Sequence, residues 1–235
     1  MIKAVFFDLD GTLLSLDMED FVRVYHTQIE KSGFYKILGT NGGKAFSSAV
    51  YAMLTNNGRA LNKDVFFETL YSLTKADLAE VKNHMDNFYA NEFDIVKYCV
   101  SPNSDAIAAV ALLKSNGYRL ILATNPLFPP AATYKRIEWA GLSPDDFEYI
   151  SHYENSRYCK PNPEYFKEAL YANGLSAEEC LFVGNDVRDD MCCIKLGFKG
   201  FLVTNHIIGD AREVPQCAKG DYSAFLSFAE NLPRV

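Results

Sequence analysis

An apolar run that ends abruptly in acidic residues constrains this chain more than any other stretch. Residues 4–7 read Ala-Val-Phe-Phe, and a run without polar alternation is typical of a strand covered on both faces of a parallel sheet. Asp8 and Asp10 follow, and because strand side chains repeat every two residues, both carboxylates start out on one side. Gly11 then permits a sharp turn.

The two carboxylates predict a metal site. Like charges this close are costly unless a cation lies between them, and oxygen-only ligands favour Mg²⁺. Ligands of open α/β sheets bind at the carboxyl ends of strands, where Asp8 and Asp10 should lie. The alternative interpretation is a solvated acidic turn after a strand.

Composition limits the classes of function. The chain has 235 residues and is 49% hydrophobic, which suits one α/β domain or a core with a modest insertion. Its formal charge of -7 argues against nucleic-acid binding, and an anionic substrate would need cationic groups in the site itself. No apolar stretch has membrane-spanning length, no signal peptide is recognisable, and the six cysteines lack C-x-x-C spacing. We therefore expect a cytoplasmic protein with reduced thiols and no membrane partner.

The order of the expected elements predicts an α/β fold with a helical insertion. Residues 15 to about 100 show helical periodicity, with a helix starting at 17–20, others over 65–73 and 78–89, and loops at 39–43 and 55–58. From about residue 101, strands over 118–123, 149–151, 180–183 and 200–203 alternate with helices over 105–115, 130–140, 163–173 and 189–196. A last helix runs through 225–226. The alternation predicts a doubly wound parallel sheet.

Polar residues follow two of these later strands, and a lysine stands alone between them. Thr124 and Asn125 follow one strand, where a hydroxyl and a backbone N–H can donate to a phosphate oxygen. Lys160 precedes a proline, which biases its backbone to an extended conformation. Asp186 and Asp190 follow the strand over 180–183. The alternatives are helix caps for the threonine and the acids, and a solvated surface charge for the lysine.

Taken in order, these segments resemble the four motifs of the haloacid dehalogenase superfamily, whose members are mostly Mg²⁺-dependent phosphatases. The first is Asp-Leu-Asp-Gly-Thr over 8–12, the second is Thr124, and the third is Lys160 with its proline. The fourth is Gly-Asn-Asp over 184–186 with a later acid, where Asn185 departs from the commoner direct Gly-Asp pair. The resemblance implies a Rossmann-like catalytic core over 1–14 and 101–235, with a helical cap domain over 15–100.

The resemblance also implies a role for each residue. Asp8 would be the nucleophile and Asp10 the general acid/base of phosphate monoester hydrolysis through an aspartyl-phosphate. The phosphate-binding residues would be Asp8, Asp10, Gly11, Thr124, Asn125 and Lys160. Mg²⁺ would be held by Asp8, the Asp10 carbonyl and Asp186, with Asp190 as the supporting acid, although the adjacent Asp189 competes for that role.

Several alternatives stay open at this point. A phosphomutase of the same family has the same four motifs, whereas a haloacid dehalogenase has no need for Asp10. A receiver-like phospho-acceptor has a different motif order, and a non-catalytic binding domain would usually have lost one of the acids. The substrate is expected to be a small phosphorylated metabolite of unknown identity. Arg59 is either an anion contact or a solvated side chain, and the aromatic residues of the insertion either meet an apolar leaving group or form a helical core.

Overall fold

The computed structural model describes all residues 1–235 and contains a parallel six-stranded sheet in the order β5-β4-β1-β6-β7-β8. The strands are β1 (Ala4–Phe7), β4 (Arg119–Leu122), β5 (Tyr149–Ile150), β6 (Cys180–Gly184), β7 (Lys199–Val203) and β8 (Ala218–Gly220). β1 lies between β4 and β6, with Phe7 paired to Leu122 and Val183. The doubly wound parallel sheet predicted from the alternation is therefore confirmed, and the first motif is central in it.

Helices cover both faces of this sheet, which explains the unbroken apolar run of β1. The helices are α6 (Ser104–Ser115), α7 (Pro130–Trp139), α8 (Pro163–Asn173) and α9 (Tyr222–Glu230). Val5 and Phe7 belong to a hydrophobic cluster with α6, α7 and α9, whereas Ala4 and Phe6 pack with α8. Since each face of β1 is buried by a different set of helices, neither can carry polar residues.

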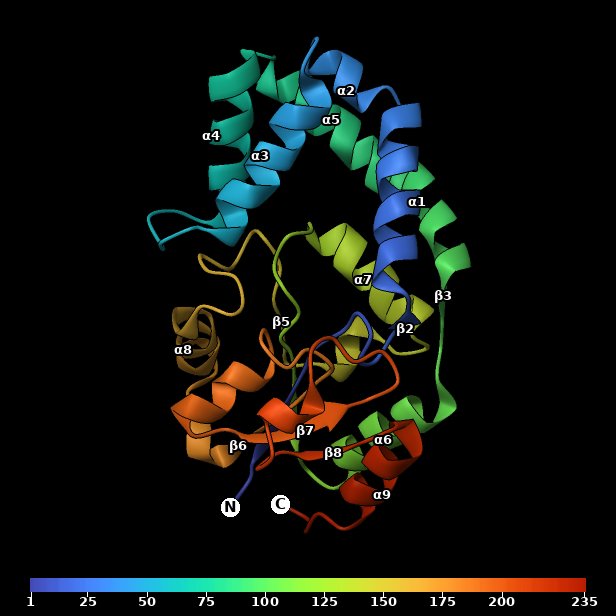
Figure 1. Cartoon of the computed structure of the whole chain (residues 1–235), viewed down its shortest axis with the longest axis vertical. Helices are drawn as coiled ribbons and strands as arrows, with labels where there is room; N and C mark the ends of the chain where they lie inside the picture. The colour runs from blue at the N-terminus through green and yellow to red at the C-terminus, as the bar shows by residue number, and fades with distance from the viewer.

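The remaining helices lie beyond the carboxyl ends of the strands, away from the two chain termini (Figure 1). They are α1 (Met18–Lys31), α2 (Phe34–Ile37), α3 (Gly42–Leu54), α4 (Asn62–Thr74) and α5 (Leu78–Asn87), followed by a π-helical turn (Phe88–Glu92) and a 3-10 helix (Phe93–Cys99). β2 (Ser15–Leu16) and β3 (Val100–Ser101) pair antiparallel where the chain enters and leaves this layer. One hydrophobic cluster runs from the sheet through α7 into α1, so the division into two domains stays a proposal. No helix combines the length and the apolar character needed to span a membrane.

Two sequence predictions differ from the structure. A helix was predicted over 189–196, but Asp189 and Asp190 lie in a turn and only a 3-10 helix (Met191–Leu196) follows. The physical reason is that the Asp190 carboxylate binds backbone N–H groups of the same loop, which holds the turn tight. The loop predicted over 39–43 is shorter than expected because α3 begins at Gly42, where buried apolar side chains at helical spacing outweigh the glycines.

Candidate active site

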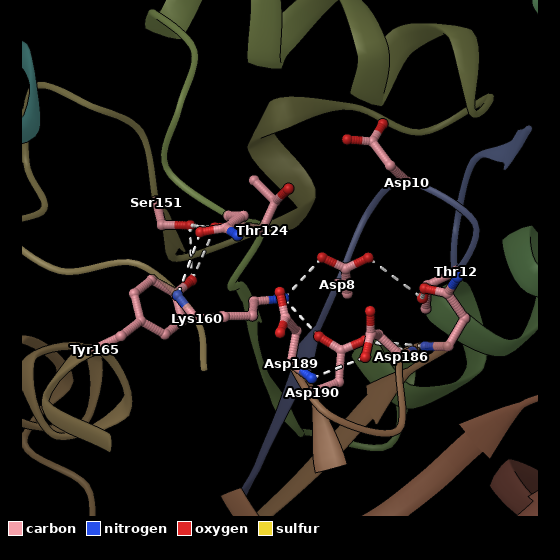
Figure 2. Close-up of polar contacts among 12 residues, drawn as sticks. Asp8, Asp10, Thr12, Thr124, Ser151, Lys160, Tyr165, Asp186, Asp189 and Asp190 are labelled. Atoms are coloured by element: carbon pink, nitrogen blue, oxygen red, sulfur yellow. Dashed lines mark hydrogen bonds and ion pairs between the residues drawn. The ribbon is translucent and has the colours of Figure 1, made fainter. Parts of the chain in front are cut away.

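The predicted site residues converge at the carboxyl edge of the sheet. Asp8 follows β1, Thr124 lies just beyond β4, and Asp186 follows β6. Figure 2 shows Asp8 between Lys160 and Thr12, with Asp186, Asp189 and Asp190 below it. A cavity of about 110 Å³ is lined by Asp8, Asp10, Thr124, Asn125, Lys160, Asp186, Asp189 and Asp190, among others. The structure therefore brings together every predicted site residue except Gly11.

Gly11 lies in the turn after β1, and it is there for steric reasons. Its φ is 81°, in the left-handed region that favours glycine. A Cβ at this position would lie 2.4 Å from the side-chain nitrogen of Asn185. Asn185 in turn accepts a hydrogen bond from the Thr12 hydroxyl at 2.9 Å. The glycine thus allows the first and fourth motifs to pack directly against each other.

Lys160 is the cation of the site. Its ammonium donates to Asp8 Oδ1 at 2.8 Å and to Asp190 Oδ1 at 2.6 Å, and its side chain is buried. Burial lowers the pKa of a lysine, but the two carboxylates outweigh it and raise the pKa of Lys160 well above its ordinary value. The ammonium is therefore charged throughout the working pH range, and burial excludes the alternative interpretation of Lys160 as a solvated surface charge.

Of the two neighbouring acids, Asp190 is the one that contacts Lys160. Its other oxygen, Oδ2, accepts from the backbone N–H groups of Asn185 at 3.0 Å and Asp186 at 2.9 Å. Burial raises the pKa of the Asp190 carboxyl, and the ammonium and the amide groups oppose that rise. A carboxylate that accepts hydrogen bonds at both oxygens is a rigid support, so Asp190 fixes both the lysine and the loop that carries Asp186.

A divalent cation has a plausible ligand set here. Asp186 Oδ1 accepts from the N–H groups of Arg188 and Asp189, both at 2.8 Å, which orients this carboxylate in the cavity it shares with Asp8. No three histidine, cysteine, aspartate or glutamate side chains gather as a metal cluster. The predicted set needs only two carboxylates and the backbone carbonyl of Asp10, and Mg²⁺ commonly combines few protein oxygens with water. The donor set thus fits Mg²⁺ by its chemistry.

Asp10 has a partner that the sequence did not predict. The guanidinium of Arg136, on α7, forms an ion pair and hydrogen bond with Asp10 Oδ2, and the arginine side chain is only 1% exposed. The guanidinium also lies over the Phe128 ring, 4.4 Å from its centroid. Arg136 lies on the buried face of α7 with Ala132 and Ile137, a position that helical spacing alone does not distinguish from a solvated one.

The Asp10 carboxyl points away from Asp8 (Figure 2), and its second oxygen is unusual. Asp10 Oδ1 is buried and has no hydrogen-bond partner. Burial raises the pKa of Asp10 more than the Arg136 charge lowers it, which favours the protonated form. A buried carboxyl that is held at one oxygen and unpartnered at the other is suited to exchange a proton with a ligand.

A second cavity of about 260 Å³ adjoins the first, and it is lined mostly by hydrophobic side chains of the helical layer. Asp10, Met18 and Asn125 line both cavities. Arg59 lines neither of these cavities; its guanidinium pairs with Glu68 at 2.8 Å on the surface.

A family model described as haloacid dehalogenase-like hydrolase matches residues 2–192. The chain is similar to the pyrophosphatase PpaX of Halalkalibacterium halodurans, with 26% identity over 89% of this chain and 86% of the relative. It is also similar to a phosphoglycolate phosphatase of Neisseria gonorrhoeae, with 27% identity over 83% and 76%. A solved 2-haloacid dehalogenase of Pseudomonas syringae pv. Tomato shares its fold, with a TM-score of 0.65, 19% identity and 98% coverage of both chains.

Proposed function

Because the chain belongs to the haloacid dehalogenase-like hydrolases, we propose that it is a Mg²⁺-dependent phosphatase of small phosphate monoesters that works through an aspartyl-phosphate. The observation that carries this proposal is that Asp8, paired to a buried lysine, lines one cavity together with Asp10, whose buried carboxyl has an unpartnered oxygen. In this proposal Asp8 attacks phosphorus and Asp10 protonates the leaving oxygen. In the proposed domain division, residues 15–100 act as a cap over a core of 1–14 and 101–235.

The first half-reaction transfers the phosphoryl group to Asp8. Lys160 occupies Asp8 Oδ1, so Oδ2, which faces only a long contact of 3.4 Å from Thr12, is the attacking oxygen. The bond between Oδ2 and phosphorus forms as the bond between phosphorus and the leaving oxygen breaks. Asp10 gives its proton to that oxygen, and the alcohol departs.

The second half-reaction regenerates the carboxylate. Water attacks phosphorus and gives its proton to the now ionised Asp10, and inorganic phosphate leaves Asp8. The ammonium of Lys160 and donors from Thr124 and Asn125 would stabilise the negative charge of the transferring group. Mg²⁺, held by Asp8, Asp186 and the Asp10 carbonyl, would supply further charge stabilisation when bound.

The contact of Arg136 with Asp10 supports phosphate ester hydrolysis rather than dehalogenation. A dehalogenase needs the nucleophile but no acid at the second position, whereas here a buried arginine is committed to positioning Asp10. A phosphomutase would use the same two aspartates, and release of inorganic phosphate without isomer formation separates the two activities. The relatives' names suggest pyrophosphate and phosphoglycolate as the first natural compounds to assay.

The test is phosphate release from p-nitrophenyl phosphate with MgCl₂, and with EDTA as the control. We expect turnover that depends on the metal and a phosphoenzyme that accumulates when Asp10→Asn is mixed with substrate, seen by mass spectrometry of the intact chain. Turnover with no phosphoenzyme detected in the wild type or in Asp10→Asn would contradict the aspartyl-phosphate intermediate. Absence of phosphate release from every ester tested would overturn the proposed function.

A further inference from the structure

The cavity of about 260 Å³, here called the aromatic cavity, has an apolar lining that phosphoryl transfer itself does not require. Its wall combines α1, α3 and the loop after β4, and includes the aromatic rings of Phe21, Tyr25, Phe46 and Phe128. These rings pack edge to face: the centroids of Tyr25 and Phe128, for example, lie 5.5 Å apart at an interplanar angle of 70°. An aromatic lining around empty space is a binding surface for apolar groups rather than a filled core.

Position ties this cavity to the reaction. Asp10 and Asn125 line it and also line the phosphoryl cavity. The leaving oxygen of a substrate must lie beside the Asp10 carboxyl that protonates it. The rest of the leaving group therefore extends past Asp10. Two further cavities border Asp10: a polar one of about 410 Å³, whose wall includes Asp17 and Glu19, and the aromatic one of about 260 Å³. Of the two, the aromatic cavity offers an apolar leaving group a matching surface.

The charge of the cavity restricts what it can hold. No lysine or arginine lines it; Arg136 contacts the wall from outside but is itself buried and already paired with Asp10. His26 does, but burial lowers its pKa, so its imidazole is neutral at pH 7. The hydroxyls of Tyr25 and Tyr89 bond each other at 2.8 Å. A carboxylate or a second phosphate placed here would lose its hydration without gaining a cation, which is costly.

We propose, on the basis of the phosphatase function above, that the preferred substrates are phosphate monoesters of uncharged alcohols with an apolar ring, and that the aromatic cavity binds this ring. Compounds with a second anionic group, such as phosphoglycolate, are poor substrates. The chain thus differs in substrate class from what the names of its relatives suggest, although it shares their phosphoryl site.

The test compares three esters with similar alkyl leaving groups: 2-phenylethyl phosphate, ethyl phosphate and phosphoglycolate. We expect kcat/KM for 2-phenylethyl phosphate to exceed that for ethyl phosphate by about 30- to 100-fold, the effect of burying one ring. Phosphoglycolate should fall at or below ethyl phosphate. Equal or better hydrolysis of phosphoglycolate than of 2-phenylethyl phosphate would overturn this inference and leave the phosphatase function intact.

A binding measurement distinguishes failure of this inference from failure of the proposed phosphatase function. The Asp8→Asn protein is titrated with 2-phenylethyl phosphate and with phosphoglycolate in a calorimeter, without any turnover. Tighter binding of the ring compound supports the inference even where no ester is hydrolysed, in which case the phosphatase function alone fails. Equal or weaker binding of the ring compound overturns the inference.

A matched pair of variants tests whether the substrate preference arises in the aromatic cavity. Val22 on α1 lines the cavity and is 43% exposed, so Val22→Lys adds a cation to the wall without burying it fully. We expect it to reduce the preference for 2-phenylethyl phosphate over phosphoglycolate about tenfold, or ~1.4 kcal/mol. Thr27→Lys, exposed on the same helix but outside the cavity, should change that ratio less than about twofold. An unchanged ratio in folded Val22→Lys would place the leaving group elsewhere.

Discussion

The cavity at the sheet edge and the aromatic cavity beyond it share Asp10, yet their walls are held in different ways. At the sheet edge, charged groups are fixed by short hydrogen bonds, such as the two that Lys160 donates at 2.8 and 2.6 Å. In the aromatic cavity most side chains are fixed by packing, as between Phe21 and Phe128, whose ring centroids lie 6.3 Å apart, and the hydrogen bond between the Tyr25 and Tyr89 hydroxyls is an exception. Directional bonds hold atoms in one geometry, whereas packed rings accept any apolar group of suitable size.

The phosphoryl chemistry and the substrate preference depend on the fold to different degrees. The phosphoryl site depends on strand register, because β4, β1 and β6 bring three strand ends to one edge. The aromatic cavity depends on the identity of side chains on helices that need only stay apolar to pack. A change in its lining would alter the substrate without altering the sheet, and the following predictions test that separation.

The largest effect is expected at Asp8. Asp8→Asn removes the nucleophile and should lower kcat by at least about 10⁴-fold, the scale of losing a nucleophile in other hydrolases. The fold should persist, because an amide can still accept from Lys160, and circular dichroism with thermal melting is the control. Activity within about tenfold of the wild type, from a variant shown by mass spectrometry not to have reverted by deamidation, would contradict the assignment.

Lys160 should affect both activity and stability. Lys160→Met leaves the Asp8 and Asp190 carboxylates buried without their cation, which should lower the free energy of unfolding by about 3–5 kcal/mol. Loss of charge stabilisation should also reduce kcat by about 10³-fold. Urea unfolding and steady-state kinetics measure the two effects.

The matched control for this variant is Lys195→Met, an exposed lysine in the next 3-10 helix. It should change the free energy of unfolding by less than about 0.5 kcal/mol. A similar small change in Lys160→Met would mean that the buried ion pairs contribute little, and that the site is held by backbone hydrogen bonds alone.

A smaller effect, on pH dependence, is expected at Arg136, which links the two cavities through Asp10. The guanidinium lowers the pKa of Asp10, so Arg136→Met should raise it further. Asp10 must be protonated to donate to the leaving oxygen, and a higher pKa keeps it protonated to higher pH. The alkaline limb of the kcat/KM profile should therefore move to higher pH.

Activity at the optimum should fall about 10- to 100-fold in the same variant, because a mispositioned acid loses part of its contribution. The second half-reaction needs ionised Asp10, so phosphoenzyme should accumulate near neutral pH. Arg136→Lys retains the charge and should restore most of the profile. An alkaline limb that stays in place in Arg136→Met would show that another group is the acid.

Much of the fold was predictable because its signals are local. The alternation of apolar strands with helices, such as those predicted over 105–115 and 163–173, located the sheet, and both helices lie within one residue of these bounds. β8 was missed because it is an exposed edge strand with no apolar pattern, and the 3-10 helix after β6 was mistaken for an α-helix. In each case long-range pairing or loop hydrogen bonding decided the structure.

The site was predictable only where a motif carried it. The residues that follow β1, β4 and β6 were found because parallel strands bring their carboxyl ends to one edge, whereas Lys160 was found only from its motif. Arg136 was missed because an arginine in a helix is usually solvated, and only the tertiary structure shows its burial beside Asp10. The sequence did not decide whether the aromatic residues of the insertion contact a leaving group or form a helical core. Periodicity shows that a helix face is apolar, but not whether other side chains fill the space against it.

The smallest effect is expected at Arg59, the one cation of the helical layer that the sequence singled out as a possible anion contact. It is 54% exposed and pairs with Glu68, which is also exposed, so Arg59→Ala should cost at most about 0.2–1 kcal/mol of stability. If the substrate's leaving group is uncharged, kcat/KM for 2-phenylethyl phosphate and for phosphoglycolate should each change less than about twofold. Glu68→Ala is the matched control, because it frees Arg59 without removing its charge. A selective loss of phosphoglycolate hydrolysis in Arg59→Ala, with a gain in Glu68→Ala, would mean that the loop over 55–61 folds onto the site and supplies a charge that the aromatic cavity lacks.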